Sequence, residues 1–197
     1  MSIDRTSFIT DKIREAIQVK EQMLVSGELI DRIGKAVSLI VLNYRRGGKV
    51  LFCGNGGSAA DAQHLSAELS GRFRKDREPL FAEALHVNTS FLTAVANDYS
   101  YEHVYARMLS AMGQNGDVLV AFSTSGHSKN ILHAVQRARE MGVKVIGMTG
   151  RDGGELASLC NIEIRIPSND TARIQEGHIL AGHMICELVE AEMFPDE

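Results

Sequence analysis

His64 and Glu68 are the pair of side chains whose types and spacing point most directly to chemistry. They stand four residues apart in a segment expected to be helical, so they project about 40° apart, from one helix face. An imidazole and a carboxylate placed together can bind a metal ion or move protons. An apolar run at 50–53 leads into this helix through the glycine turn Gly54–Gly57. Because such a turn and the dipole of the following helix attract an anion, usually a phosphate, the sequence predicts chemistry on a small phosphorylated molecule.

A second loop of the same kind follows the apolar run at 117–122. The segment Ser123–Ser128 holds three serines and a threonine around Gly126 and opens another predicted helix. Hydroxyl and N–H groups can surround a phosphate without any fixed positive charge. The alternative is a helix N-cap, which needs only one serine. Four hydroxyls in six residues therefore favour a second anion site.

The last predicted helix, at 171–193, carries further candidate ligands. Gln175 and His183 are eight residues apart, a little over two helical turns. With His64 and Glu68 they can supply nitrogen and oxygen ligands to a zinc-like ion. Each histidine taken alone is more typical of a structural role, and spacing cannot show that the two helices meet.

Three other features admit alternative interpretations. The pair Asn97-Asp98 is typical of a turn, although it can also hydrogen-bond a polyol. The basic cluster at 72–77 is typical of a solvated loop, with an active-site arginine as the alternative. Cys53, beside the glycine turn, is interpreted as a buried strand thiol rather than a reactive one.

The elements that must position these groups alternate along the chain from residue 49 onward. Strands of mostly apolar residues are predicted at 50–53, 84–87, 117–122, 143–149 and 162–166. Helices are predicted at 58–73, 89–112 with a break near Asn97, 129–141, 153–158 and 171–193. This alternation indicates the α/β class, with a parallel sheet covered on both faces and a ligand at the carboxyl ends of the strands.

The N-terminal part is expected to be helical and to belong to the same single domain. Two amphipathic helices with a break near Ser26-Gly27 account for residues 1–46, before the α/β core and C-terminal helix at 47–197. They have few strands to cover at that point of the chain. We therefore expect them to pack either on their own sheet or on another subunit.

Length, charge and composition narrow the classes of function. The 197 residues suit one domain, and the net charge of −4 gives no general attraction to nucleic acid or an anionic membrane. No segment reaches the roughly 20 apolar residues of a membrane helix. Three scattered cysteines and an N-terminus without an apolar signal core predict a reducing cytoplasm. The loose dinucleotide pattern at 54–59 is weak, because no acid that could hold a ribose follows the strand predicted at 84–87.

On these motifs the chain resembles the sugar isomerase (SIS) superfamily, and most closely its family of phosphoheptose isomerases. The resemblance covers nearly the whole chain and is carried by the segments 54–64 (GNGGSAADAQH), 96–98 (AND), 123–126 (STSG) and 173–176 (RIQE). It implies a single SIS domain with a five-stranded parallel sheet flanked by helices. It also implies a homotetramer with active sites at subunit contacts, which would give the N-terminal helices a partner surface.

The resemblance assigns roles to individual residues. Glu68 and His183 correspond to the acid/base pair of the family, and with His64 and Gln175 they correspond to its positions for one zinc ion per subunit. The positions that bind substrate are Asn55, Gly56, Gly57, Glu68, Asn97, Asp98, Ser123, Thr124, Ser125, Ser128 and Gln175. One departure is His127, where family members often have asparagine. Its titration could add some pH dependence to phosphate affinity.

The implied reaction is an aldose–ketose isomerisation. D-sedoheptulose 7-phosphate becomes D-glycero-D-manno-heptose 7-phosphate through an enediol, for nucleotide-heptose synthesis toward lipopolysaccharide or capsule. We expect Glu68 to shuttle the proton between C1 and C2, and His183 to help open the ring and protonate oxygen. A carboxylate and an imidazole suit these tasks near neutral pH. Zinc is expected to orient the hydroxyls and to stabilise the developing oxyanion.

Two other functions match parts of the same pattern. SIS proteins that bind the bacterial replication initiator share the loops and resemble this chain through 152–157 and 165–168, but that group lacks acid/base residues at the positions of Glu68 and His183. An SIS regulator that senses a sugar phosphate usually carries a fused DNA-binding domain, for which this acidic chain has no room beyond its N-terminal helices. We therefore favour an enzyme acting on a small sugar phosphate, with neither nucleic acid nor membrane as a partner.

Overall fold

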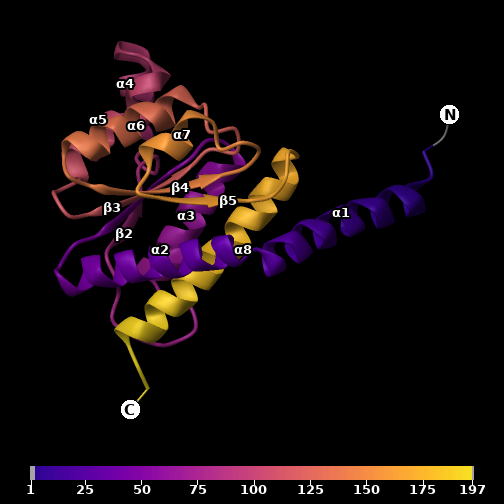
Figure 1. The fold of residues 1–197 in the computed structure, drawn as a ribbon. Coiled ribbons are helices and arrows are strands. Elements are labelled where there is room, and N and C mark those ends of the chain that lie inside the picture. Colours follow the sequence, from indigo (N-terminus) through magenta and orange to yellow (C-terminus); the bar gives the residue numbers. More distant parts are fainter. Residues whose placement is uncertain (1–2, 197) are drawn as a thin grey trace.

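A five-stranded parallel sheet forms the centre of the molecule, in a computed structural model that describes residues 3–196 (Figure 1). The strands are β1 (Val50–Cys53), β2 (Ala82–Ala84), β3 (Val118–Phe122), β4 (Lys144–Thr149) and β5 (Ile162–Arg165). Their order is β2-β1-β3-β4-β5, with Phe52 of the central region paired to Ala84 on one side and Val120 on the other. The predicted α/β class and parallel sheet are confirmed.

Helices cover both faces of the sheet (Figure 1). One face packs on α2 (Gly27–Arg45), α3 (Gly57–Ser70) and α8 (Thr171–Met193). The other packs on α4 (Thr89–Asp98), α5 (Val104–Met112), α6 (Lys129–Glu140) and α7 (Gly154–Leu159), with the 3₁₀ turn η1 (Tyr101–His103) before α5. Successive strand residues alternate between the two cores, as Phe52 and Leu51 do. Burial on both faces explains why the strands are continuously apolar.

The N-terminal helix α1 (Arg5–Val25) extends away from the sheet as an arm (Figure 1). Only Met23 of this helix is buried within the described chain. Its large exposed apolar side chains include Phe8, Ile9, Ile13 and Ile17. The predicted break is confirmed at Ser26, whose hydroxyl accepts the N–H of Leu29 (3.3 Å) and caps α2. No helix of the described residues is long and apolar enough to cross a membrane.

Three predicted boundaries are displaced. The helix predicted at 58–73 is α3 and ends at Ser70, because the N–H of Phe73 donates to the carboxylate of Glu190 (3.1 Å) instead of a helix carbonyl. The strand predicted at 84–87 is β2 (Ala82–Ala84), because the N–H of Val87 turns back to the carbonyl of Ala84 (3.3 Å) and ends the extended segment. The break predicted near Asn97 comes later, since Asn97-Asp98 forms the last turn of α4. The long final helix begins and ends at the predicted residues.

Candidate functional site

The turn between β1 and α3 is shaped by contacts that only glycine permits. The backbone carbonyl of Ser58 occupies the space that a Cβ on Gly54 would need, and Gly56 has φ +56°. The hydroxyl of the buried Tyr105 donates to the Gly54 carbonyl and so holds the turn against the core. No side chain of the described residues caps α3, and Gly57 at its start is exposed. The positive end of this helix is therefore open to an anion.

The loop between β3 and α6 forms a second compact turn. The Ser123 hydroxyl donates to Oγ of Ser128 (3.1 Å), and Oγ of Ser125 accepts the N–H of His127 (3.2 Å). Gly126 has φ +69°, and the carbonyl of Gly153 lies where its Cβ would be. The loop is therefore held in one conformation, with its hydroxyls clustered at the start of α6.

Hydrogen bonds join the glycine turn to the first turn of α6, directly after the serine loop, at the carboxyl edge of the sheet. The side-chain amides of Asn55 and Asn130 exchange two hydrogen bonds (2.9 and 2.8 Å). The Tyr101 hydroxyl donates to Oδ1 of Asn55 at 3.1 Å. Since β1 and β3 are neighbouring parallel strands, the structure places both predicted anion loops side by side.

Helices α3 and α8 pack together and bring three of the four predicted metal ligands into one cluster. Nε2 of His64 lies 2.8 Å from Oε1 of Glu68 and 3.4 Å from Nε2 of His183. One ligand atom from each residue lies within 4.8 Å of the others. The His64 side chain is 48% exposed and that of Glu68 21%, so a solute can reach the cluster. Two imidazoles and a carboxylate are a donor set that suits zinc.

The fourth predicted ligand, Gln175, lies at the other end of the same helix pair. Its side-chain amide packs against Gly57, where an added Cβ would be 2.7 Å from Nε2 of Gln175. This position is two turns of α8 before His183. Gln175 therefore borders the glycine turn, and the amide can contact a ligand bound there.

Asn97 and Asp98 lie at the end of α4, and Asp98 comes three residues before Tyr101, whose hydroxyl reaches Asn55. Both side chains are exposed at the end of α4, where Nδ2 of Asn97 donates to Oδ1 of Asp98 (3.0 Å). In the described part of the chain, neither side chain makes a hydrogen bond or ion pair with the two loops. Their contact with substrate stays a prediction.

Three residues of the site region were missed from the sequence. Tyr101 and Asn130 frame Asn55, and the Phe73 ring stacks on His183 with 5.6 Å between the centroids and 28° between the planes. Asn130 could have been considered, because it follows the serine loop by two residues. Phe73 gave no signal, because it is predicted as the last residue of the helix at 58–73, within the basic cluster interpreted as a solvated loop.

Burial changes the proton affinity of two groups near the cluster. Burial raises the pKa of Asp61 to about 6, an effect that the charge of His64 partly offsets. Asp61 lies one turn before His64 on α3, and its carboxyl takes up a proton just below neutral pH, where an exposed carboxylate stays ionised. Cys53 is fully buried in β1, which confirms its interpretation as a buried strand thiol, and this burial raises the pKa of the thiol.

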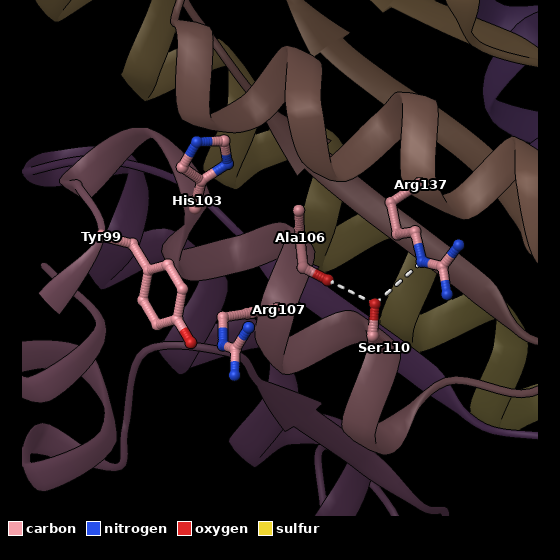
Figure 2. Close-up of a pocket in the computed structure, with 6 residues that line it drawn as sticks. All are labelled: Tyr99, His103, Ala106, Arg107, Ser110 and Arg137. Atoms are coloured by element: carbon pink, nitrogen blue, oxygen red, sulfur yellow. Dashed lines mark hydrogen bonds between the residues drawn. The ribbon is translucent and has the colours of Figure 1, made fainter.

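A separate hollow of about 250 Å³ lies between η1, α5 and α6 (Figure 2). Its lining residues are Tyr99, His103, Ala106, Arg107, Ser110 and Arg137. Ser110 is already engaged there, because its hydroxyl donates to the Ala106 carbonyl (3.0 Å) and accepts from Nε of Arg137 (2.8 Å). The Arg107 guanidinium lies over the Tyr99 ring, 4.3 Å from its centroid. Among residues 3–196 no carboxylate lines this hollow, so it lacks the acid/base set of the His64 cluster.

Comparison with known proteins shows similarity over nearly the whole chain. Residues 13–150 match the family described as SIS domain. The chain is 47% identical to a phosphoheptose isomerase of Clostridium acetobutylicum over 97% of each chain. The phosphoheptose isomerase structure from Neisseria gonorrhoeae has a TM-score of 0.89 and 40% identity, covering 94% of this chain and 98% of that one. The corresponding structure from Francisella tularensis has a TM-score of 0.91 and 37% identity, covering 95% and 98%.

Proposed function

The chain belongs to the phosphoheptose isomerases of the SIS-domain family, and from this premise we propose the reaction and the residues that carry it. The reaction is the conversion of D-sedoheptulose 7-phosphate to D-glycero-D-manno-heptose 7-phosphate through an enediol, for nucleotide-heptose synthesis. The observation that carries this proposal is the cluster of His64, Glu68 and His183 beside two neighbouring anion loops. A small phosphorylated sugar can contact both features at once.

The phosphate is assigned to the serine loop and the sugar to the glycine turn. Ser123, Thr124, Ser125 and Ser128 offer hydroxyl donors, and the uncapped start of α6 adds partial positive charge. Asn55, Gly56, Gly57 and Gln175 line the neighbouring turn, where their amides can hold sugar hydroxyls. Asn97 and Asp98 remain predicted substrate ligands on the resemblance alone.

Glu68 and His183 divide the proton transfers. We assign Glu68 as the base that removes the carbon-bound proton at C1 and returns it at C2. His183 is assigned as the group that opens the ring and exchanges protons with the sugar oxygens. His64, Glu68 and His183 are proposed to hold one zinc ion, which the donor set suits, and Gln175 is proposed as the fourth ligand on the resemblance alone. When bound, this ion supplies Lewis-acid stabilisation of negative charge on oxygen.

An NMR time course with sedoheptulose 7-phosphate tests the reaction and the metal together. The purified protein is assayed as isolated, after exhaustive chelation, and after zinc is returned. We expect aldoheptose 7-phosphate to appear in the first and third samples, with turnover lost in the second. Full turnover of the chelated protein would contradict the metal assignment. No conversion in any sample would contradict the proposed reaction.

We propose that the protein acts as a homotetramer through the apolar surface around α1. A groove of about 780 Å³ lies between α1, α2 and α8, and its lining is mostly apolar. The lining includes Met23, Leu24, Ile30, Ile33, Leu180 and Met184. With the exposed apolar side chains of α1, this makes an apolar surface of the kind that marks a protein–protein contact.

Light scattering is expected to give a mass of about 86 kDa, four times the 21.6 kDa of one chain. The change Ile13→Glu should lower this mass, because it places a charge among the exposed apolar side chains of α1. The control Arg139→Glu, at an exposed position of α6, should leave it unchanged. A wild-type mass near 21.6 kDa would refute the tetramer.

No specific observation favours the alternative of a replication-initiator partner. The similar proteins are named as isomerases, and the acid/base residues that such a binding protein would not need lie together in the fold. We assign the enzyme to the cytoplasm, where soluble sugar phosphates for a nucleotide-sugar route are made.

A further inference from the structure

The segment that follows α3 is held by one buried carboxylate. Glu190, near the end of α8, accepts three consecutive backbone N–H groups, from Phe73 (3.1 Å), Arg74 (2.7 Å) and Lys75 (3.0 Å). It also accepts Nε of Arg77 at 3.0 Å. Side chains of both Glu190 and Arg77 are nearly inaccessible, at 1% and 3% exposure. The interpretation of the basic cluster as a solvated loop is therefore wrong for Arg77.

Arg77 ties this segment to the helix that carries the proposed base. Its Nη2 donates to the backbone carbonyl of Glu68 (2.9 Å), and its Nη1 donates to those of Leu69 (2.8 Å) and Gly71 (3.0 Å). These carbonyls belong to the last turn of α3 and the residue after it, which the helix itself leaves unsatisfied. Burial raises the pKa of Glu190, but the N–H donors and Arg77 outweigh that effect and hold it below its usual range. The carboxylate is therefore ionised while it makes these contacts.

The same segment places an aromatic ring on the proposed acid/base histidine. Phe73 stacks on His183, and the N–H held by Glu190 is that of Phe73 itself. The His183 ring also meets the ring of His64 edge-on, with centroids 5.0 Å apart. Glu190 follows His183 by seven residues, about two turns along the same face of α8. The imidazole of His183 therefore contacts two rings, and the carboxylate that holds the backbone of one of them, Phe73, comes from the same helix as His183.

We propose that the Glu190–Arg77 clip is a positioning device, which seats Phe73 against His183 and so fixes the direction of its imidazole. None of these three residues needs to touch the substrate. Loss of the ring should let the imidazole turn about its side-chain bonds, and small misplacements of a catalytic group are costly: about 1 Å can lower the rate by about 10²-fold. The catalytic part of this inference rests on the proposed isomerase function, whereas the orientation of the ring does not.

Four variants separate positioning from stability. Phe73→Leu removes the ring but keeps apolar volume, and Phe73→Tyr keeps the ring. Glu190→Gln removes the charge from the clip. The matched control is Asp117→Asn, which alters another buried carboxylate that accepts backbone N–H groups, from Lys49 (3.0 Å) and Gln114 (2.7 Å). Asp117 precedes β3 and therefore lies at the opposite, amino edge of the sheet.

The first readout is the NMR spectrum of the histidine side chains without substrate, with the His183 signals identified by their loss in His183→Asn. We expect the ring signals of His183 to shift in Phe73→Leu and Glu190→Gln, and to stay near wild type in Phe73→Tyr and Asp117→Asn. The second readout is kinetic. In Phe73→Leu and Glu190→Gln, kcat should fall by about 10- to 100-fold with little change in KM. In Phe73→Tyr, which keeps the ring, kcat should stay near the wild-type value.

Unchanged His183 signals in folded Phe73→Leu would overturn the proposal, and so would unchanged kcat in both disruptive variants. An equal loss of kcat in Asp117→Asn would overturn it too, because general destabilisation would then explain the effect. If Glu190→Gln does not fold, the two Phe73 variants still test whether the ring positions His183. A wild-type protein that fails to isomerise the substrate contradicts the proposed function, and the NMR comparison still tests the orientation of His183.

Discussion

Replacing Glu68 by Gln is expected to lower the turnover of sedoheptulose 7-phosphate by about 10²–10⁴-fold, the contribution usual for a general base. Glutamine has nearly the same size, so α3 and its neighbours should be undisturbed. It cannot take a proton from carbon at neutral pH. Glu68 is suited to this role because its carboxylate is partly exposed beside the imidazole of His64, 2.8 Å away. The change is measured by steady-state kinetics, with aldoheptose formation followed by NMR.

The matched control is Glu140→Gln, at the end of α6. Glu140 is also an acid on a helix, 65% exposed and paired with Arg137 at 2.9 Å, but it belongs to the opposite face of the sheet. Its variant should keep wild-type kcat and KM. Near-full activity of Glu68→Gln would show that another group removes the proton. Because Glu68 is also a proposed metal ligand, the metal content of the variant is measured alongside, and an active metal-free variant would contradict both roles.

The alternation of the chain made the sheet and its loops predictable. Apolar runs at 50–53 and 117–122 were recognisable as strands because a parallel sheet buried on both faces needs no polar residue inside it. Since parallel strands end at one edge, the two anion loops could be expected to lie near one another. The structure adds the two hydrogen bonds between the side chains of Asn55 and Asn130, which no local sequence pattern predicts.

The meeting of α3 and α8 could not be predicted from spacing. His64 and Glu68 are neighbours by helical geometry, but His183 is 119 residues further along the chain than His64. Their contact depends on the strand order, which places both helices on the same face of the sheet. The resemblance to the SIS family implied that His183 joins His64 and Glu68. The strand order explains why the two helices that carry them meet.

The buried ion pair was missed for a related reason. Four basic residues in a short polar segment usually lie in water, and nothing local shows that Arg77 points inward. Its partner, Glu190, is 113 residues away, in a helix whose apolar pattern gave no hint of a buried acid. Burying an ion pair costs desolvation free energy, which the contacts offset only where the donors and acceptors of both side chains are satisfied. Whether they are satisfied can be seen only in the complete fold.

His178 is another group whose state depends on the completed fold. It lies on α8 with no exposed surface, and Nε2 meets the carbonyl of Thr149 at 2.9 Å. The ring packs edge-on against Phe122, with centroids 5.6 Å apart. Burial lowers its pKa from 6.5 to about 4, although the hydrogen bond to Thr149 opposes this change. The folded protein therefore keeps His178 neutral at pH values where the unfolded chain would protonate it.

This difference predicts a loss of stability on acidification. Because the unfolded chain binds the extra proton, the free energy of unfolding should fall as the pH drops from 6.5 toward about 4. The full difference corresponds to about 3 kcal/mol, of which roughly 2 kcal/mol should be lost between pH 7 and pH 5. Urea unfolding at the two pH values measures it, and His178→Gln should remove that part of the pH dependence, because glutamine can still donate to Thr149 but does not titrate. The control His127→Asn, at an exposed position, should keep the wild-type dependence. An equal pH dependence in wild type and His178→Gln would mean that other groups, not this buried imidazole, set the acid sensitivity of the fold.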